Sequence, residues 1–216
     1  MNPNEKTYEV QELFYSLKGE GAWTGYPMFF VRLAGCNLNC NFCDTVHDEP
    51  KTLTVTEIIN EWKKTPTDRV VITGGEPTLQ DLNELTKAFD RQDCWVHIET
   101  NGTNPINGCI HWICVSPKNL DLNEDTLQIA DEIKFPWTAE SGEAEFEAFR
   151  SKYEHLYIDT CERLYLLPIA RSKYEGNKDA NDFIDANVQS AIEYIKLHPN
   201  LHLSLCHQLH KCLNIK

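Results

Sequence analysis

The sequence has no run of basic residues and no apolar stretch close to twenty residues long. A helix needs about 20 apolar residues to span a bilayer, so the sequence predicts no membrane span. The formal net charge is −13. Proteins that grip a nucleic-acid backbone need clustered Lys and Arg, so nucleic acid is not an expected partner.

The sequence also lacks internal repeats, low-complexity tracts and an obvious linker. With 216 residues, of which 41% are hydrophobic, it predicts a single domain spanning 1–216. Residues 1–6 lack the apolar core of a signal peptide, so a cytoplasmic location is expected. In that reducing compartment, the nine cysteines indicate metal ligands and buried thiols rather than disulfides.

Three of the cysteines, Cys36, Cys40 and Cys43, lie close together with the spacing C-x₃-C-x₂-C. Zinc modules usually bring four ligands as two pairs, and here only His47 lies within reach as a fourth. Three thiolates suit a four-iron cluster whose fourth iron stays open to a small chelating ligand. A zinc site of three Cys and one His, or free buried thiols, remain alternatives. The other six cysteines are scattered and are expected to be buried or incidental thiols.

Apolar runs predict strands that alternate with amphipathic helices, which indicates parallel βαβ units. The expected strands are 28–33, 69–73, 95–99, 111–115, 129–135, 163–167 and 201–205, and the expected helices are 56–64, 81–89, 142–153 and 181–198. In such folds, ligands gather at the carboxyl ends of the strands. The cysteine loop directly follows the strand at 28–33, so we expect it to lie at that end.

Two further features indicate a binding site. Arg32 interrupts an apolar strand, and a buried Arg needs a carboxylate or phosphate partner, either internal or on a substrate. Gly-Gly-Glu-Pro at 74–77 follows another strand, where its glycines would let the main chain meet a ligand. Gly19, Gly21 and Gly25 predict a loop whose main chain could approach a ligand closely, but glycine content alone favours an ordinary surface loop.

The cysteine spacing and Gly-Gly-Glu-Pro resemble two motifs of the radical S-adenosylmethionine (SAM) superfamily. Within it, several segments resemble the 7-carboxy-7-deazaguanine synthase family, namely residues 16–21, 30–36, 42–45, 72–77, 98–102, 116–118 and 208–211. The resemblance runs along nearly the whole chain and is weakest over 121–157. It implies an α/β fold, a trimmed partial (β/α)6 barrel of the radical SAM type.

The resemblance implies a carbon–nitrogen lyase that converts 6-carboxy-5,6,7,8-tetrahydropterin to 7-carboxy-7-deazaguanine with loss of ammonia, in 7-deazapurine (queuosine) biosynthesis. The implied cofactors are a 4Fe–4S cluster, SAM and Mg²⁺. The implied partners are the small carboxypterin, a second copy of the chain in a homodimer, and a flavodoxin- or ferredoxin-type reductant. In this family, SAM cleavage generates a radical that abstracts a substrate hydrogen, and the cofactor supplies the hard chemistry.

The resemblance also implies residue roles. The cluster ligands are Cys36, Cys40 and Cys43; the metal ligand is Thr45; the SAM contacts are Phe42, Cys43, Asp44, Gly75, Ser116, Pro117, Lys118, Leu167, Pro168, Ile169 and Ala170; the substrate contacts are Leu17, Lys18, Gly19, Arg32 and Thr73. From the residues alone, Thr45 would be a turn residue. Lys18 and Leu167 depart from the family pattern, because Gln is common at both positions.

Two alternatives stay open. A glycyl-radical activating enzyme can be equally short with the same cysteine spacing, but it acts on a protein and would not need Arg32 and Thr45 around a small carboxylate. A zinc-binding interaction module is the alternative from a different class. His207 and His210 could be metal ligands, although a hydrogen-bonded structural role is the favoured interpretation.

Overall fold

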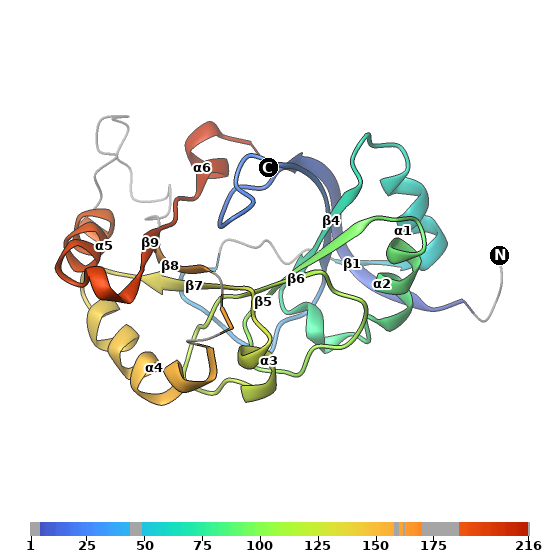
Figure 1. The fold of residues 1–216 in the computed structure, drawn as a ribbon. Helices are drawn as coiled ribbons and strands as arrows, with labels where there is room; N and C mark the ends of the chain where they lie inside the picture. Colours follow the sequence, from blue (N-terminus) through green and yellow to red (C-terminus); the bar gives the residue numbers. More distant parts are fainter. Residues whose placement is uncertain (1–4, 44–48, 158–159, 162, 170–185, 216) are drawn as a thin grey trace.

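The structure is a computed structural model that describes residues 5–43, 49–157, 160–161, 163–169 and 186–215. Its centre is a nine-stranded sheet in the order β3-β1-β2-β4-β5-β6-β7-β8-β9 (Figure 1). The strands are β1 Thr7–Leu17, β2 Pro27–Leu33, β3 Lys51–Thr54, β4 Arg69–Gly74, β5 Trp95–Thr100, β6 Trp112–Val115, β7 Glu132–Trp137, β8 Arg163–Pro168 and β9 Ser204–Leu205.

The outer side of this curved sheet carries α1 Val55–Trp62, α2 Asn83–Asp90, α3 Glu124–Gln128, α4 Gly142–Tyr157 and α5 Ala186–Leu197 (Figure 1). Helix α6 Leu209–Leu213 lies apart from them, beside the loop after β1, and short 3₁₀ turns occur at Pro77–Leu79 and Pro199–Leu201. No helix in the described part of the chain is both long and apolar enough to cross a bilayer.

The sheet is parallel from β2 through β9, while β1 pairs antiparallel with both β2 and β3. Strands β3 and β9 are edges, so the barrel is open. The expectation of a trimmed partial barrel is thus confirmed, but β1 and β3 were not expected. Continuous apolar runs identify strands that are buried on both faces. Strand β1 buries mainly Tyr8 and Val10, and β3 is half exposed, so neither carries that pattern.

Alternation of side chains along each parallel strand separates two environments. On β5, Val96 and Ile98 join the hydrophobic core under the helices. Their neighbours His97 and Glu99 point the other way, into the barrel. On β7, Phe135 likewise faces the helices and packs against the rings of α4. The barrel interior therefore receives the polar residues of these strands, while the core lies between sheet and helices.

Local sequence explains several element boundaries. Thr54 caps α1 and forms a capping box with Glu57, as its position before the apolar helix predicts. Strand β7 begins at Glu132 rather than 129, because the unexpected helix α3 occupies Glu124–Gln128 just before it. Helix α6 was also not expected. The first residues of the helix expected over 181–198 lie outside the described residues, and the described part is α5.

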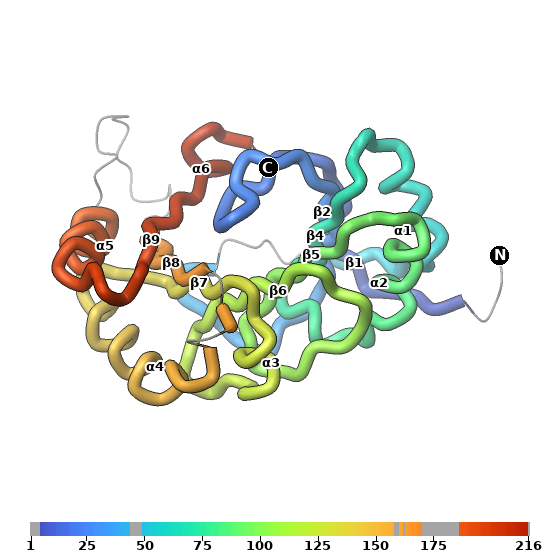
Figure 2. The backbone as a smooth tube through the Cα atoms, viewed as in Figure 1, coloured from blue at the N-terminus to red at the C-terminus, as the bar shows by residue number. Residues whose placement is uncertain are grey.

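The open side of the barrel is where the loop after β1 meets the C-terminal segment. In Figure 2, the blue loop and the red segment around α6 lie side by side. The Leu209 N–H donates to the Gly19 carbonyl over 2.9 Å. A Cβ added to Gly19 would lie 2.2 Å from Nδ1 of His210, so only glycine allows this approach.

Candidate active site at the open end of the barrel

A cavity of about 530 Å³ occupies the carboxyl ends of the parallel strands. Residues that follow different strands line it, as the placement of the motifs predicts. Cys36 follows β2, Gly75 follows β4, Asn101 follows β5 and Lys118 follows β6. Segments far apart in the sequence thus share one site.

The three cysteines of the motif all line this cavity. Cys36 and Cys43 are exposed and Cys40 is half-buried, and all three are free thiols. Burial raises the pKa of the Cys40 thiol, while the nearby Lys118 ammonium acts in the opposite direction. The Cys43 N–H donates to the Cys40 carbonyl oxygen over 3.1 Å, so these two residues share one tight turn. This donor set, open to a cavity, fits a cluster with one iron left for a chelating ligand.

The Gly-Gly-Glu-Pro segment packs directly against the start of the cysteine loop. A Cβ added to Gly75 would lie 1.8 Å from the carbonyl oxygen of Gly35, so this approach requires glycine. The fully buried Glu76 accepts hydrogen bonds from Thr100 Oγ1 and the Asn101 N–H, both over 2.7 Å. Glu76 therefore ties the end of β4 to the end of β5, a structural role that the sequence interpretation missed.

Most of the residues expected to contact SAM lie around the cavity. Phe42, Cys43, Gly75, Ser116, Lys118, Leu167 and Ile169 line it, whereas Pro117 and Pro168 do not. Asp44 and Ala170 lie outside the described residues, as does Thr45, the expected metal ligand. The Lys118 ammonium lies 2.7 Å from Ser116 Oγ and 5.6 Å from the centre of the Phe42 ring. Burial lowers the pKa of this ammonium.

The residues expected to contact the substrate, Leu17, Lys18, Gly19, Arg32 and Thr73, all line the same cavity. Arg32 is half-buried rather than buried. Its Nε lies 3.9 Å from Glu12 Oε2, which is beyond hydrogen-bonding distance. Its Nη1 lies 3.5 Å from the Gly74 carbonyl oxygen. Both contacts are long, so neither supplies the close, bidentate carboxylate pairing that suits a guanidinium.

Beneath these residues, two buried lysines and two half-buried glutamates form a network, which we call the quartet: Lys18, Glu20, Glu99 and Lys134. The Lys18 ammonium lies 2.6 Å from Glu99, and the Lys134 ammonium lies 2.8 Å from both Glu20 and Glu99. All four line the cavity. The sequence interpretation selected only Lys18. The sequence signal that could have identified the other members was a charged residue within an otherwise apolar strand, Glu99 on β5 and Lys134 on β7.

Mutual attraction keeps the quartet ionised. Burial alone would raise the pKa of the Glu20 carboxyl, but Lys134 and Lys18 outweigh it and lower that pKa to about 2. The same two lysines outweigh burial at Glu99 and hold its pKa well below the usual range. Burial also opposes the charge of Lys134, but neighbouring acids raise its pKa well above normal. Two cations and two anions therefore balance inside the barrel.

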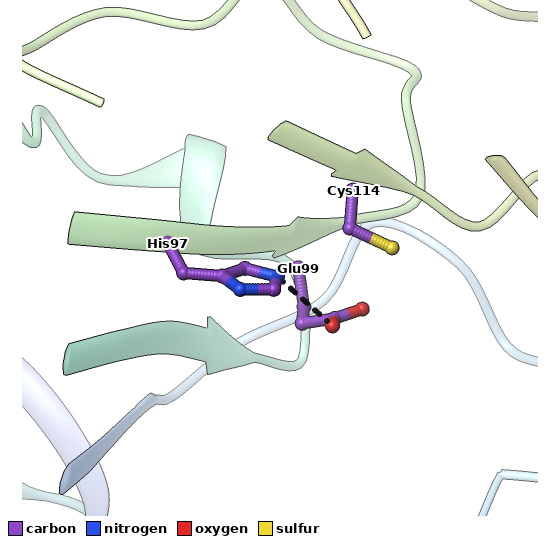
Figure 3. A group of neighbouring side chains, drawn as sticks. All are labelled: His97, Glu99 and Cys114. Carbon is purple, nitrogen blue, oxygen red and sulfur yellow. Dashed lines mark ion pairs between the residues drawn. The ribbon is translucent and has the colours of Figure 1, made fainter. Parts of the chain in front are cut away.

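Figure 3 shows His97, Glu99 and Cys114, whose possible ligand atoms lie within 4.8 Å of one another. His97 Nε2 lies 3.3 Å from Glu99 Oε1. Two features oppose a metal ion here. Glu99 already pairs with two ammonium groups, and burial raises the pKa of the Cys114 thiol well above normal. A metal needs a thiolate and an available carboxylate, so we do not assign a metal to this group.

Comparison with known proteins identifies the superfamily of this chain. Residues 31–114 match the profile of the Radical SAM superfamily, and this segment carries the cysteine motif and Gly-Gly-Glu-Pro. The crystal structure of QueE from Escherichia coli is similar, with a TM-score of 0.78 and 26% identity over 94% of this chain and 95% of that one. The fold and the three-thiol site are therefore those of a radical SAM protein.

Full-length relatives define the family. The chain is 34% identical to the 7-carboxy-7-deazaguanine synthase of Bacteroides thetaiotaomicron, over 96% of this chain and 98% of the relative. It is 31% identical to the synthase of Flavobacterium psychrophilum, over 95% and 91% of the two chains. The chain belongs to the 7-carboxy-7-deazaguanine synthase family.

Proposed function

We propose that this protein converts 6-carboxy-5,6,7,8-tetrahydropterin to 7-carboxy-7-deazaguanine with loss of ammonia. It is then a carbon–nitrogen lyase of 7-deazapurine (queuosine) biosynthesis. The observation that carries the proposal is a single cavity lined by three motif thiols on one side and by Arg32 and Thr73 on another, in a chain of this family. Membership in that family leaves a glycyl-radical activating enzyme or a zinc-binding module without support.

In this proposal, Cys36, Cys40 and Cys43 hold the 4Fe–4S cluster. SAM lies against the main chain at Gly75 and beside Ser116 and Lys118, with further contacts from Phe42, Asp44, Pro117 and residues 167–170. When bound, the cluster and SAM supply the chemistry that abstracts a hydrogen. The close approach of Gly75 to the cysteine loop supports this arrangement, because it leaves the main chain of that segment uncovered by a side chain.

The protein's own task is to place the pterin. We assign the substrate carboxylate to the Arg32 guanidinium, which lines the cavity and has the planar, forked geometry that binds a carboxylate. Thr73 and the loop residues Leu17, Lys18 and Gly19 surround the ring. Fixing the ring from several sides holds the reacting hydrogen in one place, and the surrounding walls exclude water from the reactive intermediate.

Magnesium is a further part of the proposal, with Thr45 as its protein ligand. Thr45 comes two residues after Cys43, while Arg32 comes four residues before Cys36. Both positions thus flank the cysteine loop. A hydroxyl is a hard oxygen donor, and Mg²⁺ keeps most of its waters while it bridges to oxygen atoms of a ligand. One cation and one guanidinium would then orient the substrate from different sides.

We also propose that the enzyme acts as a homodimer in the cytoplasm and receives electrons from a flavodoxin- or ferredoxin-type protein. The open barrel supports the dimer: β3 and β9 are edge strands of the sheet. An edge strand presents unpaired backbone groups that another surface can cover. Sedimentation of the purified protein as a monomer at micromolar concentration would contradict the dimer.

The test is an anaerobic incubation of the reduced enzyme with SAM, Mg²⁺ and the carboxypterin, followed by mass analysis of the products. We expect a brown protein with iron and sulfide that forms 7-carboxy-7-deazaguanine and releases ammonia. Cleavage of SAM without the deazaguanine would contradict the substrate. A colourless protein with stoichiometric zinc would contradict the enzyme class.

A further inference from the structure

Lys134 contacts both carboxylates of the quartet. It extends inward from β7 and its side chain is 2% exposed. Its ammonium lies 2.8 Å from Glu20 Oε2, on the loop after β1, and 2.8 Å from Glu99 Oε2, at the end of β5. One buried cation therefore joins three separate segments of the barrel.

The contacts of the two carboxylates are divided between their oxygens. The Oε1 atom of Glu99 faces the Lys18 ammonium at 2.6 Å, and the Oε1 atom of Glu20 accepts a hydrogen bond from Gln208 over 2.9 Å. The Oε2 atom of each points at Lys134. Each oxygen of the two carboxylates thus has a charged or polar group close to it. Because both residues also line the cavity, their remaining lone pairs are presented to whatever fills it.

Burying four charges is costly for folding, because each ion loses its hydration and the mutual attraction repays that loss only with good geometry. Apolar residues of similar size could fill the same volume at comparable or better stability. A buried charge network on the wall of a ligand cavity is therefore better explained by the ligand than by stability alone.

We propose that Lys134 is a positioning residue, which clamps Glu20 and Glu99 so that both carboxylates face the N–H donors of the bound pterin ring. The identity of the ring rests on the proposed function, whereas the clamp rests on the contacts above. Lys134 acts through the two carboxylates. It does not donate a proton, because the Lys134 ammonium and both carboxylates stay ionised.

Removal of Lys134 changes the charge balance around the carboxylates. Other titratable groups face this region from several elements: Lys18, His97, Cys114, Lys118, Glu132 and Cys206. Without Lys134, Glu20 and Glu99 share chiefly the single charge of Lys18. Loss of the Lys134 ammonium raises the pKa of both carboxyls, so their protonation becomes more sensitive to pH than in the wild type.

The experiment compares Lys134→Met with the wild type by steady-state kinetics across neutral pH. We expect the KM for the carboxypterin to rise at least tenfold, with cluster content unchanged. We also expect the KM of the variant to depend on pH where that of the wild type does not. Lys64→Met is the matched control, because Lys64 is 67% exposed and pairs with Glu61 on the surface. The KM of this variant should equal that of the wild type.

A second variant separates positioning from stability. Lys134→Met/Glu20→Gln restores charge balance, with Lys18 opposite Glu99, and should regain much of any loss in Tm. If Lys134 positions the carboxylates, the KM of this double variant stays raised. If Tm and KM both return to the wild-type values, the role of Lys134 is only structural and the proposal is wrong.

The outcomes also separate this proposal from the function itself. If the wild-type enzyme forms no deazaguanine, the proposed function is wrong. The ring bound by Glu20 and Glu99 is then not the pterin. A Lys134→Met enzyme that folds and keeps the wild-type KM at every pH overturns the clamp alone.

Discussion

The ammonium of Lys18 lies 2.6 Å from Glu99 Oε1 inside the barrel and joins the loop after β1 to the end of β5. Lys18 also donates to the Glu20 carbonyl oxygen over 2.9 Å. A Gln at position 18 would leave the network with two acids and one base. The Lys of this chain instead makes the quartet electrically neutral.

The first prediction concerns Lys18, whose side chain is 5% exposed. Lys18→Met removes both the charge and the donor, whereas Lys18→Gln keeps a donor for the Glu99 carboxylate. Leaving a buried acceptor unsatisfied costs about 1–3 kcal/mol. We therefore expect Lys18→Met to be less stable than Lys18→Gln by about that amount in urea denaturation. Equal stabilities of the two variants would show that Glu99 does not depend on this donor.

The arrangement of the parallel strands could be predicted from sequence, because strands such as 69–73 and 111–115 are continuous apolar runs between turns. The antiparallel strand β1 could not, since most of its residues are half-buried or exposed and show no such run. Helix α6 could not either: it has five residues, and its contact with Gly19 is made through the main chain. Local patterns carry no information about such long-range contacts.

In the candidate site, the residues that belong to recognisable motifs could be predicted from sequence. Cys36, Gly75 and Ser116 line one cavity because each follows a different parallel strand. Lys134 and Glu99 were missed, since a charged residue within a strand shows neither which face it takes nor which partner it meets. Their pairing spans 35 positions in the sequence and depends on the curvature of the whole sheet.

The second prediction is a dependence of stability on acid pH. Because the pKa of Glu20 falls to about 2 on folding, its ionised form stabilises the native state above its unfolded pKa of 4.5. That contribution to the free energy of unfolding, on the order of 3 kcal/mol, is lost as pH falls from 4.5 to about 2. We expect Glu20→Gln to be less stable than the wild type at neutral pH, and the difference to shrink below pH 4.5. A difference that stays constant in urea denaturation down to acid pH would contradict the ion pair.

The third prediction concerns the cluster. Cys36→Ala, Cys40→Ala and Cys43→Ala should each lose most of the iron and the brown absorbance, since one thiolate is the only protein ligand to its iron. Cys212→Ala is the matched control, because Cys212 is an exposed thiol that does not line the cavity. Iron analysis and SAM cleavage measure the effect. Full iron content in any of the three motif variants would remove that cysteine from the ligand set.

The fourth prediction concerns magnesium. If Thr45 ligates Mg²⁺ beside the substrate, Mg²⁺ should stimulate turnover of the wild type, and Thr45→Ala should lose most of that response while keeping its cluster. Thr45→Ser keeps the hydroxyl and should keep the response. The measurement is product formation as Mg²⁺ is titrated. Turnover by the wild type that is independent of Mg²⁺ would contradict the metal role.

The fifth prediction concerns Arg32. Its guanidinium lines the cavity and is half-buried there, so a carboxylate on the bound pterin can make a charge-assisted, bidentate contact with it. Arg32→Ala should raise the KM for the carboxypterin at least about 30-fold, which corresponds to about 2 kcal/mol. Arg32→Lys should recover only part of that loss, because an ammonium cannot make the bidentate contact of a guanidinium.

SAM cleavage without substrate provides the internal control for Arg32, because this residue is assigned to the pterin and not to the cluster or SAM. We expect Arg32→Ala to keep its iron content and this uncoupled cleavage. A second comparison uses a pterin that lacks the carboxylate. The wild type should bind it weakly, and Arg32→Ala should bind it no more weakly than the wild type does. If Arg32→Ala weakened binding of both pterins equally, Arg32 would contact the ring or support the cavity wall rather than bind the carboxylate.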